Sequence, residues 1–410
     1  MDIKRIAYLA PELPSLSATF VSNEIFALEA KGLEILPYSV HKPSHPAHGD
    51  QMAALAERTT NLYDRSLLKA LGTGLKLLVS RPMKVLSTKK KVLSDAFQVG
   101  FFSLTAVKLI YQFVRAADLA VMLISSRAQH LHVHFAHVPT QIGMYAADMA
   151  GIPFSFMVHA NDIFERPLLI KEKVARAHRA VSISQFNVEL MREKGADLDR
   201  IEIVRCGVDA KQYGDLSVND RANPIYTIGT IGRLVEKKGI DTLIEAAHTL
   251  KASGHEFRME IAGDGPLWKD LEKMVKNLDL TDRVHFLGSL PHIEVLRWMQ
   301  QLDVFVLAGK KDRNGDMDGI PVVLMESMML GVPVISTRLS GIPELVIHEK
   351  TGLIGEPDSA TDLVDNLTRM MQRSEEITDF SAAAKQWIVS EFDRSLNADR
   401  LIRIFNLNQN

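Results

Sequence analysis

Short runs of apolar residues alternate along the chain with longer stretches in which apolar residues recur every three or four positions. The first pattern is typical of buried parallel strands and the second of helices that cover them, so together they predict an α/β fold with parallel sheets. The first series of expected strands is IKRIAYLA, LEILPYSV, HLHVHFA, PFSFMVH, RAVSIS and IEIVRCG. The second series is IYTIGTIGR, FRMEIAG, RVHFLG, DVFVLAG, VPVIST and TGLIGE.

A polar segment that contains proline, GDLSVNDRANP at about 214–224, separates the two series and is typical of a linker. We therefore expect two Rossmann-like parallel-sheet domains that face one another across a cleft: residues 1–215, with a helical insertion at about 50–128, and residues 216–385. A C-terminal helix, residues 386–410, is expected to pack back on the first domain. The length of 410 residues agrees with this division, because one hydrophobic core seldom serves more than about 250–300 residues.

Composition and charge narrow the class of protein. The net charge of -2 gives no sign of a nucleic-acid partner. Cys206 is the only cysteine, so the chain cannot form an internal disulfide and a reducing compartment is expected. The apolar stretch VGFFSLTAVKLIYQFVRAADLAVMLI is interrupted by Lys108, Arg115 and Asp118, which argues against a transmembrane helix. We therefore expect a cytoplasmic protein.

Positive charge is concentrated in one segment, residues 65–91. It holds eight basic residues and no acidic residue: Arg65, Lys69, Lys76, Arg81, Lys84, Lys89, Lys90 and Lys91. Because leucine and valine are mixed with these cations, the segment has the composition of a helix that lies on a membrane surface. On this interpretation the protein contacts anionic lipids at the inner face of the cytoplasmic membrane. An ordinary solvated helix that covers the core is the alternative.

Two loops after strands of the second series carry candidate chemistry. In GRLVEKKG, Gly232 and Arg233 end a strand and Lys238 precedes the next helix. Two cations in a glycine-containing turn suit a diphosphate, because Arg binds it in a fork and Lys adds a compact charge; a solvated charged loop is the alternative. In IAGDGPL, Gly263 lies in a tight turn that leads into a helix.

The stretch DGIPVVLMES places Asp318 ahead of a helix and Glu326 on its second turn. The backbone N–H groups of Gly319 and Ile320 would be unsatisfied at a helix start and can bind an anion or a hydroxyl, while Pro321 fits the first helical turn. Glu326 faces either solvent or the cleft. In the cleft its carboxylate can accept two hydroxyl protons from a ribose or a sugar.

Motifs that are missing also bear on function. There is no G-x-G-x-x-G after the first strand and no G-x-x-x-x-G-K-[ST], which argues against dehydrogenases and nucleoside triphosphatases. Asp316 and Asp318 form a D-x-D that could hold a divalent metal on a diphosphate. Because Arg233 and Lys238 can neutralise the phosphates themselves, we expect no metal and no other cofactor.

The first half contributes polar residues at strand ends. The run HLHVHFAH places three histidines on one face of a strand, as in a metal site or as cleft-lining or core residues: His130, His132 and His134. Since no cysteine or carboxylate follows nearby, the non-metal interpretation is expected. His159 and Asp162 in VHANDIF should project into the cleft, and PSLSATF supplies Ser15 and Ser17 on the same side.

Taken together, GRLVEKKG, IAGDGPL, DGIPVVLMESMMLGVPVIST and SGIPELV followed by TGLI resemble glycosyltransferase family 4, whose members are retaining sugar-nucleotide transferases with the GT-B fold. This resemblance covers most of residues 225–360. PSLSATFVSNEIFAL, HVHFA and FSFMVHANDIF are similar to its bacterial exopolysaccharide branch, which includes colanic-acid-type transferases. The resemblance implies a hexosyl-type transferase that acts on a glycan or a polyprenyl-linked oligosaccharide.

The resemblance also implies roles for individual residues. Arg233 and Lys238 would bind the donor diphosphate and stabilise it as it leaves, and Glu326 would hold the ribose of the nucleotide. Asp318 and the backbone of Gly319–Pro321 would contact hydroxyls of the donor sugar. Asp318 departs from the family, which has Glu at this position, and the shorter side chain puts the direct sugar contact in doubt.

On the acceptor side, His159 would lie by the donor sugar with Asp162 behind it, and Ser15, Ser17 and His134 would contribute to the same region. Two other functions stay open. One is a GT-B-type sugar-nucleotide epimerase, which needs no acceptor. The other is a catalytically weakened, membrane-associated protein that binds nucleotide sugars. The motifs do not identify the donor sugar, the base or the acceptor.

Overall fold

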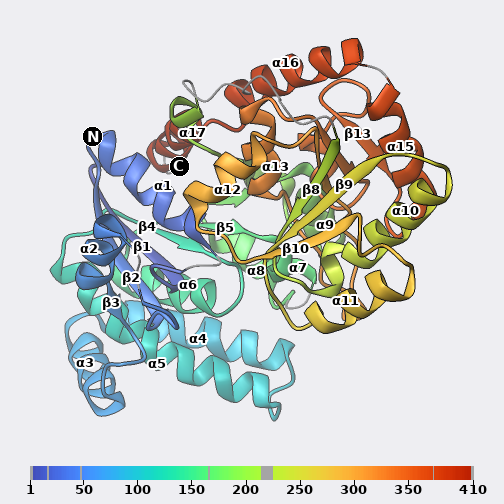
Figure 1. Cartoon of the computed structure of the whole chain (residues 1–410). Helices are drawn as coiled ribbons and strands as arrows, with labels where there is room; N and C mark the ends of the chain where they lie inside the picture. The colour runs from blue at the N-terminus through green and yellow to red at the C-terminus, as the bar shows by residue number, and fades with distance from the viewer. Residues whose placement is uncertain are drawn as a thin grey trace. The chain divides into compact units, whose positions relative to one another are not determined.

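The computed structural model describes residues 3–15, 18–46, 49–164, 167–213, 225–372 and 374–407. The chain forms two compact units, each built on a parallel sheet (Figure 1). Unit 1 consists of residues 1–204 and 398–410, and unit 2 of residues 205–397. The segment expected as a linker, 214–224, lies outside the described residues.

Unit 1 contains a seven-stranded sheet in which all neighbouring strands are parallel, in the order β3-β2-β1-β4-β5-β6-β7. The strands β4 and β5 are buried along their whole length, which explains their uninterrupted apolar character. The strands are β1 (Arg5–Glu12), β2 (Glu34–His41), β3 (Thr60–Asn61), β4 (His130–His134), β5 (Phe154–Val158), β6 (Arg179–Ser182) and β7 (Ile201–Ile203).

Helices cover this sheet in more than one layer. The helices of unit 1 are α1 (Thr19–Ala30), α2 (Asp50–Arg58), α3 (Leu67–Ser80), α4 (Pro82–Gln98), α5 (Leu104–Ser125), α6 (Val138–Ala150), α7 (Ala160–Phe164), α8 (Ile170–Arg176) and α9 (Gln185–Glu193), with a 3₁₀ turn η1 (Leu198–Arg200). Helix α6 lies against β4 and β1, α5 packs on α6, and α3 and α4 pack on α5. The pair α3 and α4 therefore forms an additional layer, drawn in light blue in Figure 1.

The segment expected as a helical insertion, residues 50–128, is mostly but not wholly helical. It includes the short strand β3, which pairs with β2. The basic segment 65–91 forms two helices and not one: α3 ends at Ser80 and Pro82 opens α4. Proline is favoured at the first helical position, where its missing N–H has no partner to lose, so the break follows from the sequence.

Unit 2 contains a six-stranded parallel sheet in the order β10-β9-β8-β11-β12-β13. Its strands are β8 (Tyr226–Ile231), β9 (Phe257–Ala262), β10 (Val284–Gly288), β11 (Val304–Leu307), β12 (Val334–Thr337) and β13 (Leu353–Gly355). Its helices are α10 (Ile240–Ala252), α11 (Trp268–Asn277), α12 (His292–Met299), α13 (Val322–Leu330), α14 (Ile342–Leu345), α15 (Ala360–Gln372) and α16 (Ser374–Glu391), with 3₁₀ turns η2 (Ala210–Tyr213) and η3 (Glu236–Lys238). All twelve strands expected from the sequence are present, and β3 is additional.

The last helix, α17 (Arg394–Asn406), contains the second division between the units, at 397/398. The first division lies at 204/205, ahead of the expected position at 215/216. Residues 398–410 belong with unit 1, where the ring of Phe405 lies 5.0 Å from that of His130 and Asn406 accepts a hydrogen bond from the Ile3 N–H. None of the described helices is both long and apolar enough to span a bilayer.

Candidate active site

The order of strands in unit 2 identifies a switch point between β8 and β11, where the direction of the chain across the sheet changes. Strands β8 and β11 are neighbours, but the chain continues from β8 to β9 on one side and from β11 to β12 on the other. Such a switch point leaves a crevice outside the carboxyl ends of the two strands, where α/β sheets bind ligands. The loop 232–239 follows β8 and the loop 308–321 follows β11.

The loop after β8 is fixed against the end of β11. Gly239 has a positive φ of +61°, and a Cβ atom added there would lie 1.7 Å from the Ala308 carbonyl oxygen. Only glycine allows this approach. The Lys310 N–H donates to the Lys237 carbonyl at 3.0 Å, which ties the two loops together at the switch point.

Three ion-pair contacts join the same loops through side chains. Lys238 Nζ lies 2.5 Å from Asp318 Oδ2, and Lys237 Nζ lies 2.7 Å from Asp316 Oδ2 and 3.6 Å from Asp318 Oδ1. Burial alone would lower the pKa of Lys237, but its hydrogen bonds and charge interactions with the two aspartates outweigh this and raise it. Each lysine is thus held in an ion pair with a carboxylate of the loop after β11.

Arg233 differs from the lysines. It follows β8 directly and is exposed. Its carbonyl accepts from the Val235 N–H at 2.8 Å, but its side chain makes no hydrogen bond or ion pair with any described residue. Its guanidinium is thus available to an anion at the switch point, whereas Lys238 would first have to exchange Asp318 for the anion.

The start of α13 is one residue later than expected. Pro321 is the N-cap, with φ −72° and ψ 125°, and the helix begins at Val322, so Pro321 does not lie in the first turn. No side chain among the described residues caps this helix start. Ile320 and Leu324 belong to one buried cluster. The Leu324 N–H donates to the Pro321 carbonyl at 3.2 Å, so a ligand at this helix start would be bound by the N–H groups ahead of Leu324.

Glu326 is turned away from bulk water. Only 13% of its side chain is exposed, and its Oε1 lies 3.0 Å from His292 Nε2. It also accepts a hydrogen bond from Tyr213, whose pKa is raised mainly by burial and further by the charge of Glu326. The hydrogen bond to Glu326 raises the pKa of His292. Glu326 therefore belongs to a polar cluster with α12 and η2.

A cavity of about 550 Å³ adjoins the loops after β9 and β10. Its lining includes Asp264, Trp268 and Ser289. Gly263 brings this loop close to the loop after β8, since its φ is +117° and a Cβ there would lie 2.0 Å from the Gly232 carbonyl oxygen. Gly232 and Gly263, which were separate candidates in the sequence, thus make a close backbone contact at the carboxyl edge of the sheet.

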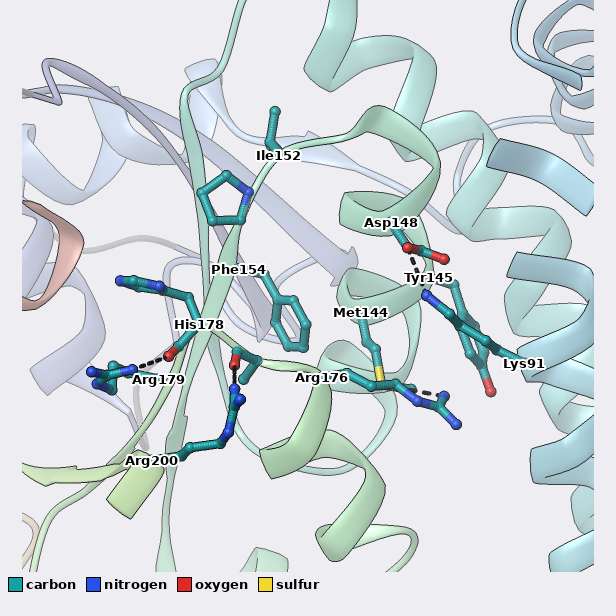
Figure 2. A pocket seen from close by; sticks show the side chains of 12 residues that line it. Lys91, Met144, Tyr145, Asp148, Ile152, Phe154, Arg176, His178, Arg179 and Arg200 are labelled. Carbon is teal, nitrogen blue, oxygen red and sulfur yellow. Dashed lines mark hydrogen bonds and ion pairs between the residues drawn. The ribbon is translucent and has the colours of Figure 1, made fainter. Parts of the chain in front are cut away.

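A second cavity, of about 310 Å³, lies in unit 1 at the amino ends of its strands (Figure 2). It opens at the amino ends of β5 and β6 in unit 1. Most of its cations are engaged: Lys91 is paired with Asp148 at 2.8 Å, and Arg176 forms two hydrogen bonds with Asp95. This cavity is thus away from the carboxyl ends of the unit 1 strands, where a ligand is expected in a parallel sheet.

The switch point of unit 1 lies between β1 and β4. Ser15 is in the turn after β1, and Ser17 lies outside the described residues. The histidines of β4 are all buried, and two of them share one hydroxyl partner: Ser155 Oγ lies 2.8 Å from His130 Nε2 and 2.7 Å from His132 Nδ1. They are core residues, but His130 Nδ1 and His132 Nε2 have no hydrogen-bond partner among the described residues.

His134 connects this core to a carboxylate on α1. Its Nε2 lies 2.9 Å from Glu24 Oε1, which also accepts from the Tyr8 hydroxyl at 2.7 Å. Glu24, His132 and His134 are the one set of described residues whose ligand atoms, all within 4.8 Å of each other, could hold a metal ion. Because Glu24 already has two partners, its charge is compensated by hydrogen bonds without an ion.

His159 is buried and does not project freely from the strand end. It is 6% exposed, its ring lies 4.8 Å from that of Phe20 and 4.5 Å from that of Phe135, and its Nε2 is 3.3 Å from His134 Nδ1. Burial, with smaller effects from neighbouring histidines, lowers its pKa well below the usual value. The imidazole is therefore neutral at pH 7.

Asp162 supports the backbone and not the imidazole of His159. Its Oδ2 accepts from the N–H groups of His159 and Ala136, both at 2.8 Å, and burial raises its pKa to about 7. Lys173, also buried, donates to the Ala136 carbonyl at 2.6 Å, and burial lowers its pKa to about 7. Asp162 therefore lies behind His159 through the backbone, and it fixes the loop that carries the histidine.

Several residues of these sites carry no local sequence signal. Glu24 is 110 positions from its partner His134, and Lys237 is 79 positions from Asp316. Such pairs are brought together only by the sheet order, so no pattern in one segment could have identified them.

Two family models match the chain. Residues 218–387 match the model described as glycosyl transferases group 1, and residues 90–212 match the model described as glycosyltransferase family 4. The second model covers part of unit 1 and the first covers most of unit 2.

Similar proteins agree with these matches. The chain is 28% identical over 408 residues to a putative colanic acid biosynthesis glycosyltransferase, WcaL, of Escherichia coli, covering 96% of this chain and 97% of that protein. It is 31% identical over 252 residues to the amylovoran biosynthesis glycosyltransferase AmsK of Erwinia amylovora, covering 60% of this chain and only 62% of that protein. Among solved structures, a glycosyltransferase from Rickettsia africae has a TM-score of 0.71 at 14% identity, with 98% of each chain covered. Anabaena Alr3699/HepE in complex with UDP has a TM-score of 0.70 at 14% identity, covering 97% of this chain and 98% of that one.

Proposed function

Because the chain belongs to the glycosyltransferases, with a family 4 segment followed by a group 1 segment and the two parallel-sheet units of the GT-B fold, we propose that it transfers a hexosyl group from a nucleotide-diphospho-sugar. The acceptor is a glycan or a polyprenyl-linked oligosaccharide in exopolysaccharide or cell-envelope polysaccharide synthesis. The names of two relatives support this acceptor class: WcaL is a putative colanic acid biosynthesis glycosyltransferase and AmsK an amylovoran biosynthesis glycosyltransferase.

The observation that carries the donor assignment is the exposed side chain of Arg233, which has no partner among the described residues and shares the loop after β8 with Lys238. Arg233 and Lys238 bind the diphosphate, with the uncapped start of α13 and the close contact of Gly232 with Gly263 beside it. This is the edge of the sheet where a nucleotide is expected in an open α/β fold.

The remaining donor contacts divide between two acids and a backbone segment. Glu326 holds the ribose, and it can do so because its carboxylate is already desolvated by its neighbours. Asp318, once released from Lys238, accepts a hydrogen bond from a hydroxyl of the donor sugar. The Gly319–Pro321 backbone contacts the hydroxyls of the same sugar.

The reaction is driven by electrostatic stabilisation of the leaving group. Breaking the bond from the anomeric carbon to the phosphate oxygen leaves positive charge on the sugar and negative charge on the diphosphate. Pre-placed cations and a helix start stabilise that anion, and removing one such group typically costs about 10²–10³ in rate. We propose a metal-independent reaction because these cations can neutralise the diphosphate. Asp316 and Asp318, the acids that could bind a metal, form ion pairs with Lys237 and Lys238.

The stereochemistry we propose is retention. The acceptor oxygen attacks the anomeric carbon from the face that the diphosphate leaves, and its proton passes to a departing phosphate oxygen, so the bond to phosphate breaks as the glycosidic bond forms. No side-chain nucleophile is assigned. In unit 1, neutral His159 accepts a hydrogen bond from a sugar or acceptor hydroxyl, and Asp162 holds the loop that carries it. Ser15, Ser17 and His134 are the other residues that we assign to the acceptor side.

The test is a panel of UDP-, GDP- and other nucleotide sugars. Thermal shift identifies the donor, and mass spectrometry with NMR of the products then reports transfer and the anomeric configuration. A transferred or slowly hydrolysed sugar of unchanged configuration supports the proposal. An isomerised donor would instead indicate an epimerase, and binding without turnover would indicate a nucleotide-sugar-binding protein.

A further inference from the structure

One region of unit 1 exposes far more apolar surface than the rest of the described chain. Of twenty large apolar side chains that are exposed, fifteen lie between residues 67 and 110. We call them the apolar face: Leu67, Leu68, Leu71, Leu75, Leu78, Val79, Met83, Leu86, Leu93, Phe97, Phe101, Phe102, Leu104, Val107 and Ile110. They belong to α3, α4, the turn 99–103 and the start of α5, which lie together in Figure 1.

This exposure is not needed to build the unit. Other residues of the same helices, such as Leu77 and Val92, already face inward and form part of the core. The outward residues include Leu68, Met83 and Phe102, which are 80%, 79% and 98% exposed. Contiguous apolar patches of this kind are rare on free monomers and mark a contact with a partner or a membrane.

The charges on the same face have one sign. Residues 67–110 contain eight basic residues and a single acid, Asp95, which is buried and bound to Arg176. Lys91 is paired with Asp148, but the lysines at positions 69, 76, 84, 89, 90 and 108 are exposed between the apolar side chains. A second copy of the chain would bring two such positive surfaces together, which is unfavourable.

A groove runs into this face. It has a volume of about 350 Å³ and is lined mainly by apolar side chains of α3, α4 and α5, including Leu71, Leu75, Leu86 and Phe113. Lys89 also contributes to the lining. An apolar groove with an ammonium group is chemically matched to a hydrocarbon chain that ends in a phosphate.

We propose that the apolar face docks on an anionic lipid bilayer. The Phe101–Phe102 turn and the outward residues of α3 and α4 enter the acyl region, the exposed lysines contact lipid phosphates, and the groove takes one hydrocarbon chain from the bilayer. The interleaving of aliphatic and aromatic residues with lysine is what an interfacial helix requires, whereas protein interface cores are depleted of lysine. The surface is larger than the basic segment 65–91 and includes the turn before α5.

Vesicle co-sedimentation tests this directly. The native chain should bind vesicles that contain about one-third phosphatidylglycerol at least ~10-fold more tightly than pure phosphatidylcholine vesicles, and binding should weaken with salt. The double variant Phe101→Ser/Phe102→Ser and the triple variant Lys84→Gln/Lys89→Gln/Lys90→Gln should each reduce binding by a factor of about ten or more.

Matched controls come from exposed residues elsewhere. Leu198→Ser/Val389→Ser removes two other exposed apolar side chains, and Lys273→Gln/Lys276→Gln removes two exposed lysines of α11; both should bind as the native chain does. Equal binding to both vesicle types, loss of binding in the controls, or no binding by the native chain would overturn the proposal. So would a dimer that Phe101→Ser/Phe102→Ser dissociates, since the face would then be a protein interface.

A second readout does not depend on the folding of the serine variants. All three tryptophans of the chain, Trp268, Trp298 and Trp387, lie in unit 2, so Phe102→Trp places a reporter on the apolar face. Its emission should shift to the blue with anionic vesicles and be quenched by brominated acyl chains, while Val389→Trp should show neither effect. A Phe102→Trp signal that vesicles leave unchanged contradicts insertion. The measurement needs no sugar donor, so its failure would leave the proposed transferase reaction untouched.

Discussion

Lys238 Nζ lies 2.5 Å from Asp318 Oδ2, which joins the loop after β8 to the loop after β11 at the switch point of unit 2. The residue assigned to the departing diphosphate is therefore held by the residue assigned to the donor sugar. Binding of the donor exchanges this ion pair for contacts of each partner with a different part of one ligand.

Arg233→Ala and Lys238→Ala should each lower turnover by about 10²–10³, because each removes a cation from the leaving group. Neither change affects the core, so the free energy of unfolding should move by less than about 0.5 kcal/mol. Initial rates of sugar transfer and urea unfolding measure the two quantities. Lys273→Ala, an exposed lysine of α11, is the control. Near-native rates in both variants would contradict the leaving-group assignment.

Asp318→Asn should tighten the binding of inorganic pyrophosphate about three- to fivefold, since it frees Lys238 from a partly exposed ion pair of roughly 1 kcal/mol or less. The same variant should transfer sugar more slowly, because the donor loses its acidic contact. Isothermal titration and initial rates report the two effects. If pyrophosphate binding weakens instead, Asp318 does not compete for Lys238.

Glu326→Gln should weaken the binding of a nucleoside diphosphate about fivefold, since a charged acceptor for the ribose becomes a neutral one. Binding of inorganic pyrophosphate, which has no ribose, should not change. The ratio of the two affinities, measured on one protein preparation, isolates the ribose contact. His292→Asn alters the same cluster without removing the carboxylate and should leave the ratio near its native value. A parallel loss for both ligands would argue for a structural role of Glu326.

Stability should fall as the pH is lowered through about 6. Burial keeps the pKa of His130, His132 and His159 far below 6.5, so these groups take up protons only in the unfolded chain. Asp162, with a folded pKa of about 7, takes up one proton in the folded chain first. The unfolded chain then binds about two more protons, and the free energy of unfolding should drop by roughly 2–3 kcal/mol per pH unit below pH 6.

Urea unfolding at pH 7, 6 and 5 measures this slope. In His130→Asn one of the titrating groups is gone, and the slope should become smaller by about 1.4 kcal/mol per pH unit whatever the variant does to stability at pH 7. An unchanged slope would show that His130 is protonated in the folded chain.

Gly263→Ala should destabilise unit 2 by about 1–3 kcal/mol and weaken donor binding, because the new Cβ would lie 2.0 Å from the Gly232 carbonyl oxygen at a φ of +117°. Gly254→Ala is the matched control. Gly254 also has a positive φ, but nothing lies within 4 Å of a Cβ built there, so only backbone strain of about 1 kcal/mol is expected. Equal unfolding free energies for the two variants would show that the loop yields without cost.

The strands were predictable because each is an apolar run bounded by polar residues, whereas their order within each sheet was not predicted. Pro82 signals the break between α3 and α4, but the cations are spread across it, and residues 65–91 were expected as one helix. Local patterns thus identified the expected strands, but they missed β3, the boundary between α3 and α4 and the exact start of α13.

The site was predictable only where its residues are neighbours in the chain. Lys238 and Arg233 share a loop, so their joint chemistry could be inferred from spacing. The capture of Lys238 by Asp318 spans 80 positions, and the burial of His159 depends on Phe20 and Phe135 from other segments. Such contacts depend on how the strands are ordered, which a linear pattern does not specify.

Unit 2 is one uninterrupted stretch, residues 205–397, set between two parts of unit 1. The final part of unit 1 is needed at the sheet, where Phe405 covers His130 and Asn406 binds Ile3. A chimera with a relative should therefore exchange residues 205–397 and keep residues 1–204 and 398–410 from the same protein. A simple head-to-tail fusion of one protein's first half with another's second half would supply a mismatched terminal helix to the wrong sheet.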